Sequence, residues 1–189
     1  MGCAKSKEGL SEEDLEILRS NTKFNENTIK ELHRGFKQDC PNGKLGPAKF
    51  ADIYKMLFAH GNTRQFSDHI FRTLDTDKNG FIDFKELLLA IDVTSAQPAE
   101  EKLKWAFRVY DVDGNGVVDQ EEMTRIVRAI YEILGACATK PTDSADELVK
   151  NIFRRMDENH DGHISEEEFL SACLQDDELR KMLVLEVWQ

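Results

Sequence analysis

The sequence lacks several features that would place the protein in a common class. It has no secretory signal peptide and no apolar run near the roughly 20 residues of a membrane-spanning helix. Its four cysteines show no paired short spacing, which favours reduced thiols in a cytosolic protein. With 25 Lys and Arg against 36 Asp and Glu, the net charge of −11 argues against binding nucleic acid. Glycine-rich phosphate loops, nucleophile elbows and paired Cys/His motifs are also missing, so an enzyme is the weakest interpretation.

What the sequence does contain is a twelve-residue motif, Asp111–Glu122, with an oxygen-bearing side chain at positions 1, 3, 5, 9 and 12. Gly116 stands at position 6, where the backbone must turn sharply, and Val117 at position 7 can offer its carbonyl oxygen. A Ca²⁺ ion takes about six to eight oxygen ligands at flexible geometry, and a loop with this spacing wraps them around one ion. The longer side chain of Glu122 can reach back with both oxygens. This is the loop pattern of an EF-hand.

The motif recurs at a period of roughly 40 residues, so the chain is an array of like units. We call the three intact copies loops 2, 3 and 4. Position 8 is apolar and β-branched in each (Ile82, Val118 and Ile164), which in paired units joins two loops through a short strand contact. The expected metal ligands, with the backbone carbonyl at position 7, are Asp75, Asp77, Asn79, Phe81, Asp83 and Glu86 in loop 2; Asp111, Asp113, Asn115, Val117, Asp119 and Glu122 in loop 3; and Asp157, Asn159, Asp161, His163, Ser165 and Glu168 in loop 4.

A further copy upstream, loop 1, has lost its ligands. With Leu45 aligned to position 8, Gly43 preserves the turn at position 6. Positions 1, 3, 4 and 12 are Gln38, Cys40, Pro41 and Lys49. A cation therefore replaces the last carboxylate, and the proline stiffens the loop. We expect loop 1 to bind no Ca²⁺ and to remain as the packing partner of loop 2.

Apolar residues at helical spacing flank every loop. They predict an all-α fold of four EF-hand helix-loop-helix units, paired into two lobes with short loop–loop strand pairs. We expect an acylated tail over residues 1–10, an N-terminal lobe over 11–94, and a C-terminal lobe with a final helix over 100–189. The boundary is the short segment Thr94–Ala99, in which Pro98 starts the next helix.

The stretch Phe24–Phe84 is dense in aromatic and aliphatic residues. Ordinary core packing accounts for most of them. A groove open to an acyl chain or to a partner helix is the alternative interpretation.

The first residues, Met1-Gly2-Cys3-Ala4-Lys5-Ser6, fit the acceptor pattern for N-myristoylation of Gly2. One myristoyl chain binds a membrane only marginally, with a constant of about 10⁴ M⁻¹. Candidates for a second membrane signal are Lys5 with Lys7, or palmitate on Cys3; an unmodified Cys3 is the alternative.

The chain resembles the neuronal calcium sensor family, the group of recoverin, the visinin-like proteins, neurocalcin and frequenin, over essentially its whole length. The Cys40-Pro41 break is specific, because it is how that family disables its first loop. The stretches that carry the resemblance are Met1-Gly2, Asp39–Gly43, Phe71–Asp75, Ile82–Phe84, Val93–Ser95, Lys102–Phe107, Tyr110–Gly116 and Ala129–Tyr131.

The resemblance implies Ca²⁺ at loops 2, 3 and 4 and a covalent myristate on Gly2, which several members bury without Ca²⁺ and release with it. It also implies a target of the receptor kinase, guanylate cyclase, lipid kinase or ion channel class. Three departures stand out. Leu32-His33 replaces the usual Trp-Tyr, and we expect a partly buried His33 rather than a metal ligand. Gln97-Pro98 stands where many members have a linker glycine, which makes acyl release by lobe rotation less secure. Loop 4 is intact, unlike that of recoverin.

We therefore expect a cytoplasmic, peripherally membrane-bound Ca²⁺ sensor whose exposed apolar surface changes when Ca²⁺ binds. The alternative is a passive cytosolic Ca²⁺ buffer, against which the acyl signal argues. Three bound Ca²⁺ would bring the formal charge from −11 to about −5. Loop 4 has three acidic ligands against four in loops 2 and 3, so we expect it to bind most weakly. Mg²⁺ in the resting loops and a homodimer are left open.

Overall fold

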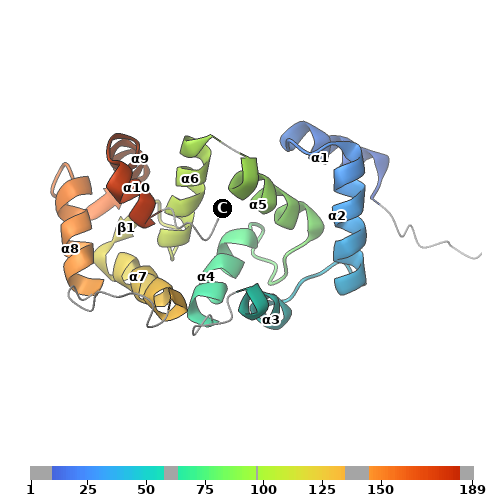
Figure 1. The fold of residues 1–189 in the computed structure, drawn as a ribbon, viewed down its shortest axis with the longest axis horizontal. Coiled ribbons are helices and arrows are strands. Elements are labelled where there is room, and N and C mark those ends of the chain that lie inside the picture. Colours follow the sequence, from blue (N-terminus) through green and yellow to red (C-terminus); the bar gives the residue numbers. More distant parts are fainter. Residues whose placement is uncertain (1–9, 58–63, 97, 135–144, 184–189) are drawn as a thin grey trace, which may run out of the picture.

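A computed structural model describes residues 10–57, 64–96, 98–134 and 145–183. The predictions about Gly2, Cys3 and Gln97 fall outside these residues. Within them the chain forms ten helices and one two-stranded sheet, which confirms the all-α prediction (Figure 1). The elements are α1 (Glu12–Asn21), α2 (Glu26–Asp39), α3 (Pro47–Leu57), α4 (Arg64–Leu74), α5 (Phe84–Ala96), α6 (Ala99–Tyr110), β1 (Val117–Asp119), α7 (Gln120–Leu134), α8 (Ala145–Met156), β2 (His163–Ser165), α9 (Glu166–Gln175) and α10 (Asp177–Leu183).

The loops join two by two through their position-8 residues, as predicted. Leu45 of loop 1 and Ile82 of loop 2 exchange two backbone hydrogen bonds of 2.9 Å each in an antiparallel bridge. Loops 3 and 4 join through the antiparallel strands β1 and β2, with Val118 opposite Ile164. All four side chains are buried, so each loop–loop contact is part of the hydrophobic core beneath its helices. We call α2–α5 the first pair and α6–α9 the second pair.

The two pairs lie side by side as two lobes, and α4 of the first pair contacts both α6 and α7 of the second (Figure 1). The Thr73 hydroxyl on α4 donates to the backbone oxygen of Arg108 on α6 at 3.5 Å. Pro98 is the N-cap residue of α6, at the start of that helix as the sequence predicts, but Thr94 to Ala96 of the expected linker are the last residues of α5. The helix that enters loop 3 thus begins shortly after the helix that leaves loop 2.

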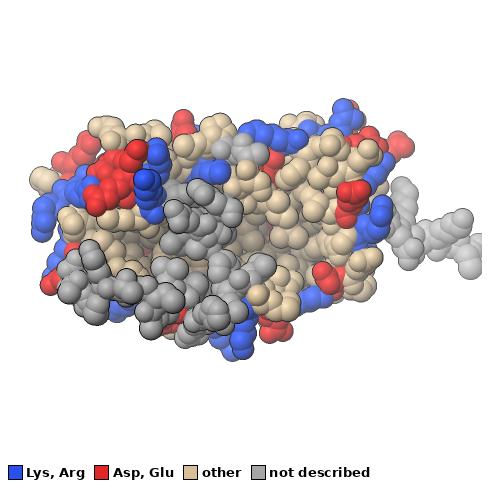
Figure 2. All heavy atoms as spheres, viewed as in Figure 1, with Lys and Arg blue, Asp and Glu red and all other residues tan. Residues whose placement is uncertain are grey.

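Aromatic rings fill the interior of both lobes. In the first pair, Phe36 packs against Phe84 with ring centroids 5.7 Å apart, and Phe50 packs against Phe71 at the same distance. Most aromatic side chains of the described first half are buried, which supports ordinary packing for those residues. Some apolar side chains nevertheless remain exposed on this half: Ile17, Met56, Phe81 and Leu89. Figure 2 shows that much of the surface over the first pair is uncharged, with Lys, Arg, Asp and Glu gathered toward its rim.

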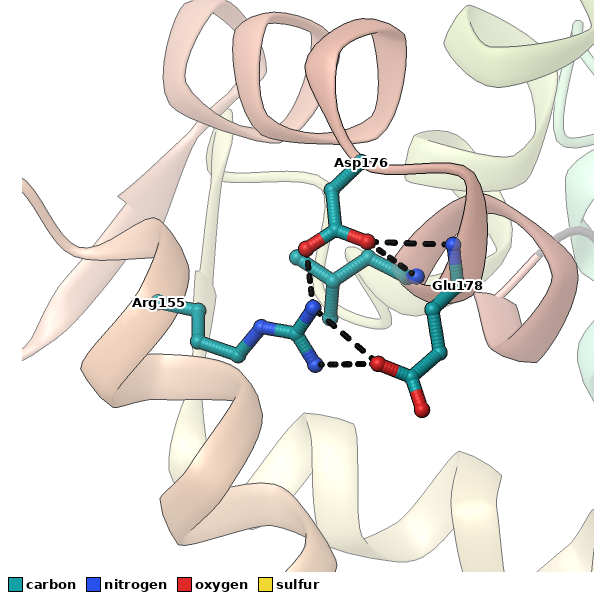
Figure 3. A network of polar contacts seen from close by, with 4 residues as sticks. Arg155, Asp176 and Glu178 are labelled. Atoms are coloured by element: carbon teal, nitrogen blue, oxygen red, sulfur yellow. Dashed lines mark hydrogen bonds and ion pairs between the residues drawn. The ribbon is translucent and has the colours of Figure 1, made fainter.

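The last helix is fixed to the second pair by a polar network (Figure 3). Arg155 at the end of α8 makes ion pairs with Asp176 and Glu178, the latter at 3.4 Å. Asp176 also accepts hydrogen bonds from the backbone N–H groups of Glu178 and Leu179, at 3.0 and 3.2 Å. These backbone bonds first, and then the Arg155 guanidinium, lower the pKa of the Asp176 carboxyl despite some desolvation. One carboxylate therefore ends α9, begins α10 and ties both to α8.

The helix α10 covers apolar surface of the second pair. Leu179 and Leu183 are buried, and the Tyr110 hydroxyl donates to the Leu183 backbone oxygen at 3.3 Å. The sequence predicts a final helix in this part of the chain, and the described residues confirm it as far as Leu183. None of the described helices combines the length and apolar character needed to cross a membrane.

Candidate metal centres

Loop 2 begins where α4 ends, and its first ligand organises the turn. The Asp75 carboxylate accepts the backbone N–H of Asn79 at 3.0 Å and that of Gly80 at 2.9 Å. Gly80 has φ +83°, a conformation that costs glycine little and other residues more. The Asn79 side-chain oxygen accepts the N–H of Phe81 at 2.9 Å. The turn therefore forms around the ligand side chains, as the spacing predicts.

The position-12 glutamate closes loop 2 from the other side. Glu86 lies in the first turn of α5, and its Oε1 accepts from the backbone N–H and the hydroxyl of Thr76, at 2.8 and 2.9 Å. Its Oε2 accepts the N–H of Asp83 at 2.9 Å, and Asp83 Oδ1 accepts the N–H of Glu86 at 2.9 Å. Both carboxylate oxygens of Glu86 are thus held inside the loop. Because Glu86 is part of α5, these bonds tie the helix that leaves the loop to the loop itself.

Loop 3 repeats this geometry. Glu122 Oε1 accepts from the backbone N–H groups of Val112 and Asp113, at 2.9 and 3.1 Å, and its Oε2 accepts from Asp119 at 3.0 Å. Asp111 accepts the N–H of Gly116 at 3.0 Å. Loops 2 and 3 therefore use the same backbone contacts.

Carboxylates converge on one point in each of these loops. Oxygens of Asp75, Asp77 and Glu86 lie within 4.8 Å of one another, and so do oxygens of Asp111, Asp113 and Glu122. Three like charges at this separation repel strongly, and a divalent cation between them removes that repulsion. The donors are all oxygens, which suit a hard ion such as Ca²⁺ and not a thiolate-loving metal. The chemistry of the donor set thus fits the predicted ion.

Loop 4 has the same pattern of backbone hydrogen bonds as loops 2 and 3 but fewer acidic side chains. Asp157 accepts the N–H of Gly162 at 3.1 Å, and Glu168 Oε1 accepts the N–H of Glu158 at 3.1 Å. No triplet of converging acidic side chains is found in loop 4 among the described residues, since position 3 is the amide Asn159. The side-chain oxygen of Asn159 accepts the N–H of Asp161 at 2.8 Å.

Ser165, at position 9 of loop 4, acts as a helix cap. Its hydroxyl accepts the Glu168 N–H at 3.3 Å and its backbone N–H donates to Glu168 Oε2 at 2.9 Å, a reciprocal capping box that starts α9. The hydroxyl also donates to Glu168 Oε2 at 2.8 Å. Burial opposes ionisation of Glu168, but hydrogen bonds from Ser165 and from the N–H groups of Asn159 and Glu158 outweigh it and lower its pKa. Position 12 of loop 4 is therefore a carboxylate directed into the loop, like Glu86 and Glu122. His163 lies on β2 with an exposed side chain, and the predicted position-7 ligand is its backbone oxygen.

Loop 1 is closed by ammonium groups. The Lys49 Nζ, at position 12, donates to the backbone oxygen of Asp39 at position 2. The Lys37 Nζ donates to the backbone oxygen of Pro41 at 2.7 Å. Position 12 thus contacts position 2 in all four loops, with donor and acceptor reversed in loop 1. This arrangement supports the prediction that loop 1 binds no Ca²⁺.

The histidines of the described residues belong to none of these acidic groups. His33 is partly buried and meets the Phe84 ring edge-on at 4.8 Å. Desolvation by burial, and then the charge of Lys37, lower the pKa of His33. This confirms the expectation of a partly buried histidine on an apolar stripe.

Two features of the site were not found by reasoning from the sequence. The Thr76 hydroxyl supports Glu86, and a polar residue at position 2 was the available signal. Lys85 pairs with Asp14 of α1 at 2.5 Å. This contact joins segments far apart in the chain, and no local spacing in the sequence predicts it.

Comparisons with known proteins agree with this geometry. Residues 100–174 match the family model described as an EF-hand domain pair, and residues 41–91 match a second model with that description. The chain is 41% identical over 187 residues to neuronal calcium sensor 1 of Lymnaea stagnalis, covering 98% of this chain and 97% of that protein. The chain belongs to the neuronal calcium sensor family. This neuronal calcium sensor is also 34% identical to human recoverin over 190 residues, covering 98% of this chain and 94% of recoverin.

Proposed function

We propose that this neuronal calcium sensor binds three Ca²⁺, in loops 2, 3 and 4, and regulates a membrane-associated target when it does so. The observation that carries the proposal is the pair of converging carboxylate triplets, at Asp75, Asp77 and Glu86 and at their equivalents in loop 3. Loop 4 joins them through its matching backbone contacts to Glu168.

The proposed ligands are those of the intact loops. Side chains at positions 1, 3, 5 and 12 and the backbone oxygen at position 7 hold the ion, and the position-9 side chain completes or braces the shell. The bound ion supplies a divalent charge that offsets carboxylate repulsion. Glu86 and Glu122 lie in the first turns of α5 and α7, and Glu168 lies in that of α9. Drawing each glutamate onto an ion therefore shifts the helix that leaves the loop, which is how sensor EF-hands open an apolar groove.

The proposal extends to the ends of the chain and to its partners. Gly2 carries a myristoyl group, and this group with the apolar surface of the first lobe brings the protein from the cytoplasm to a membrane. The target belongs to the receptor kinase, guanylate cyclase, lipid kinase or channel class, and the protein itself is not an enzyme. Mg²⁺ is the proposed occupant of the loops at resting Ca²⁺.

Calorimetric titration of the full chain with Ca²⁺, in the presence and absence of Mg²⁺, tests the first part. We expect three binding events, and a Glu→Gln change at Glu86, Glu122 or Glu168 should remove one event each. Loop 4 should have the highest Kd of the three because it has the fewest acidic ligands. Tighter binding at loop 4 than at loops 2 and 3 would refute this order.

Sedimentation of the acylated chain with liposomes, together with binding of an apolar dye, tests the second part. We expect both signals to increase with Ca²⁺, and the Gly2→Ala variant should lose sedimentation but keep dye binding. Ca²⁺ binding that changes neither signal would instead identify a passive buffer.

A further inference from the structure

The first helix is attached to α5 at two polar points. Asp14 Oδ1 of α1 pairs with the Lys85 Nζ of α5 at 2.5 Å. Beyond the end of α1, the backbone N–H of Lys23 donates to Asp92 Oδ1 at 2.8 Å, and Asp92 is only 1% exposed. Leu18 of α1 is buried in the core between these points. Figure 1 shows α1 lying against α2 and α5. The helix that follows the N-terminal tail is thus docked on the helix that leaves loop 2.

The partner of Asp14 is itself part of loop 2. Lys85 occupies position 11, between Asp83 and Glu86, the expected ligands at positions 9 and 12. Asp14 is held in place from its other side, since the Ser11 hydroxyl donates to its Oδ2 at 2.6 Å. The Lys85 ammonium thus pairs with an oriented carboxylate on α1 and interacts by charge with Asp83 of loop 2.

Loop 2 is alone among the intact loops in this respect. Position 11 is Glu121 in loop 3 and Glu167 in loop 4, so only loop 2 has a cation beside its last ligand. Glu121 pairs within its own helix, with Arg125 at 3.1 Å, and no ion pair links it to another element within the described part of the chain. The link between α1 and a metal loop is thus particular to loop 2.

We propose that Asp14 is a positioning residue that tightens Ca²⁺ binding in loop 2, and that docking of α1 and occupancy of loop 2 favour each other. This inference rests on the proposed function, in that loop 2 must bind Ca²⁺. Two electrostatic effects act in the same direction. Asp14 holds the Lys85 ammonium away from the carboxylates that the ion needs, and it adds a negative charge beside the loop. Because coupling between two sites is reciprocal, Ca²⁺ in loop 2 must in turn stabilise α1 in its docked position.

The test uses the full chain with loops 3 and 4 disabled by Glu122→Gln and Glu168→Gln, so that calorimetry measures loop 2 alone. Asp14→Asn should raise the Kd about two- to fivefold, the range that Coulomb's law gives for one unit charge about 10 Å from a divalent ion in water. Glu12→Gln is the matched control, because it removes the same charge from the same helical turn without breaking the ion pair. Asp14→Glu should restore binding.

A cycle with Lys85→Met separates the two effects. Without the ammonium group, Asp14→Asn should raise the Kd by a smaller factor than it does in the parent. Hydrogen exchange of the α1 amides gives a second readout: Ca²⁺ should slow it in the parent by a factor similar to the change in Kd, and should not slow it in Asp14→Asn.

The outcomes distinguish this inference from the proposed function. If loop 2 takes up no Ca²⁺ in the parent, both are wrong. If loop 2 binds Ca²⁺ but Asp14→Asn leaves its Kd unchanged, or changes it no more than Glu12→Gln does, the inference alone is overturned. If Ca²⁺ does not change the hydrogen exchange of the α1 amides in the parent, the inference is likewise overturned.

Discussion

The two EF-hand pairs are built alike at their loop contacts but differ in their ligands. The first pair joins a loop without acidic ligands to an intact one through the Leu45–Ile82 bridge. The second pair joins two intact loops through β1 and β2, with Val118 opposite Ile164. The position-8 contact and the buried apolar residues persist in both pairs. Loop pairing therefore does not require acidic side chains at the ligand positions of both loops.

The way in which the loops close explains how loop 1 pairs without acidic ligands. In loops 2, 3 and 4, a position-12 glutamate accepts a hydrogen bond from the backbone N–H at position 2. In loop 1 the ammonium of Lys49 donates instead to the backbone oxygen at position 2. Loop 1 thus has a positive charge of its own, on the side chain of Lys49. It keeps its shape without gathering acidic ligands.

The largest effect should come from the pairing contacts. Ile82→Ala and Ile164→Ala each remove a side chain that is 0% exposed, so each should lower the free energy of unfolding by about 2–5 kcal/mol. Denaturant unfolding measures this. The comparison predicts similar losses in the two pairs, although one has a disabled loop. If Ile164→Ala lowered the free energy of unfolding and Ile82→Ala did not, the pairing of the loops would depend on their acidic ligands.

Removing a position-12 charge comes next. Glu122→Gln should weaken Ca²⁺ binding in loop 3 by about 100-fold, or about 2.7 kcal/mol, because a bidentate charged ligand is lost. The pairing of loops 3 and 4 should survive, as it survives in loop 1. Calorimetry measures the first effect, and backbone amide exchange of Val118 and Ile164 measures the second.

The junction between the pairs should respond to acid. His69 on α4 is 8% exposed, and burial first, then the charges of Arg72 and Arg125, lowers its pKa to about 4. The unfolded chain has a histidine pKa near 6.5, so it binds the proton first as the pH falls, and stability is lost below that value. From pH 6.5 to 5 we expect a loss of about 1.5 kcal/mol from this residue.

The variant His69→Gln isolates that contribution, since it keeps a polar side chain without the titration. Its stability should fall less than that of the parent over the same pH interval. Equal slopes for the two proteins would exclude His69 as the cause.

Loop 4 offers a gain of binding. Ser165→Asp supplies a fourth acidic ligand and should tighten Ca²⁺ binding in that loop by about tenfold. Ser165→Ala is the control, because it loses the capping bond and should destabilise α9 by about 1 kcal/mol without improving binding. A Ser165→Asp variant that binds no more tightly than the parent would contradict the charge-count argument.

The smallest effect should come from Lys49→Met. It deletes the ammonium that closes loop 1 and should cost about 1 kcal/mol of stability. No Ca²⁺ site should appear, since Gln38 and Cys40 still occupy ligand positions. A fourth binding event in the titration of this variant would show that Lys49 alone disables the loop.

The sequence by itself determined where the loops lie and how their backbone turns. Glycine at position 6, oxygen ligands at fixed spacing and a β-branched residue at position 8 act within twelve residues, so the order of residues alone assigns Asp75, Gly80, Ile82 and Glu86 to their places. The helical periods around the loops then fixed the fold class. These interactions are local, and local spacing is what a sequence displays directly.

Only the tertiary structure decided which distant side chains meet. It placed Asp14 against Lys85, it tied α10 to Arg155 through Glu178, and it buried His69 where the two pairs touch. Such contacts depend on how the helices pack against one another, and the period of a helix gives its buried face but not its neighbour. The coupling between α1 and loop 2 follows from that packing, because its two charges come from segments far apart in the chain.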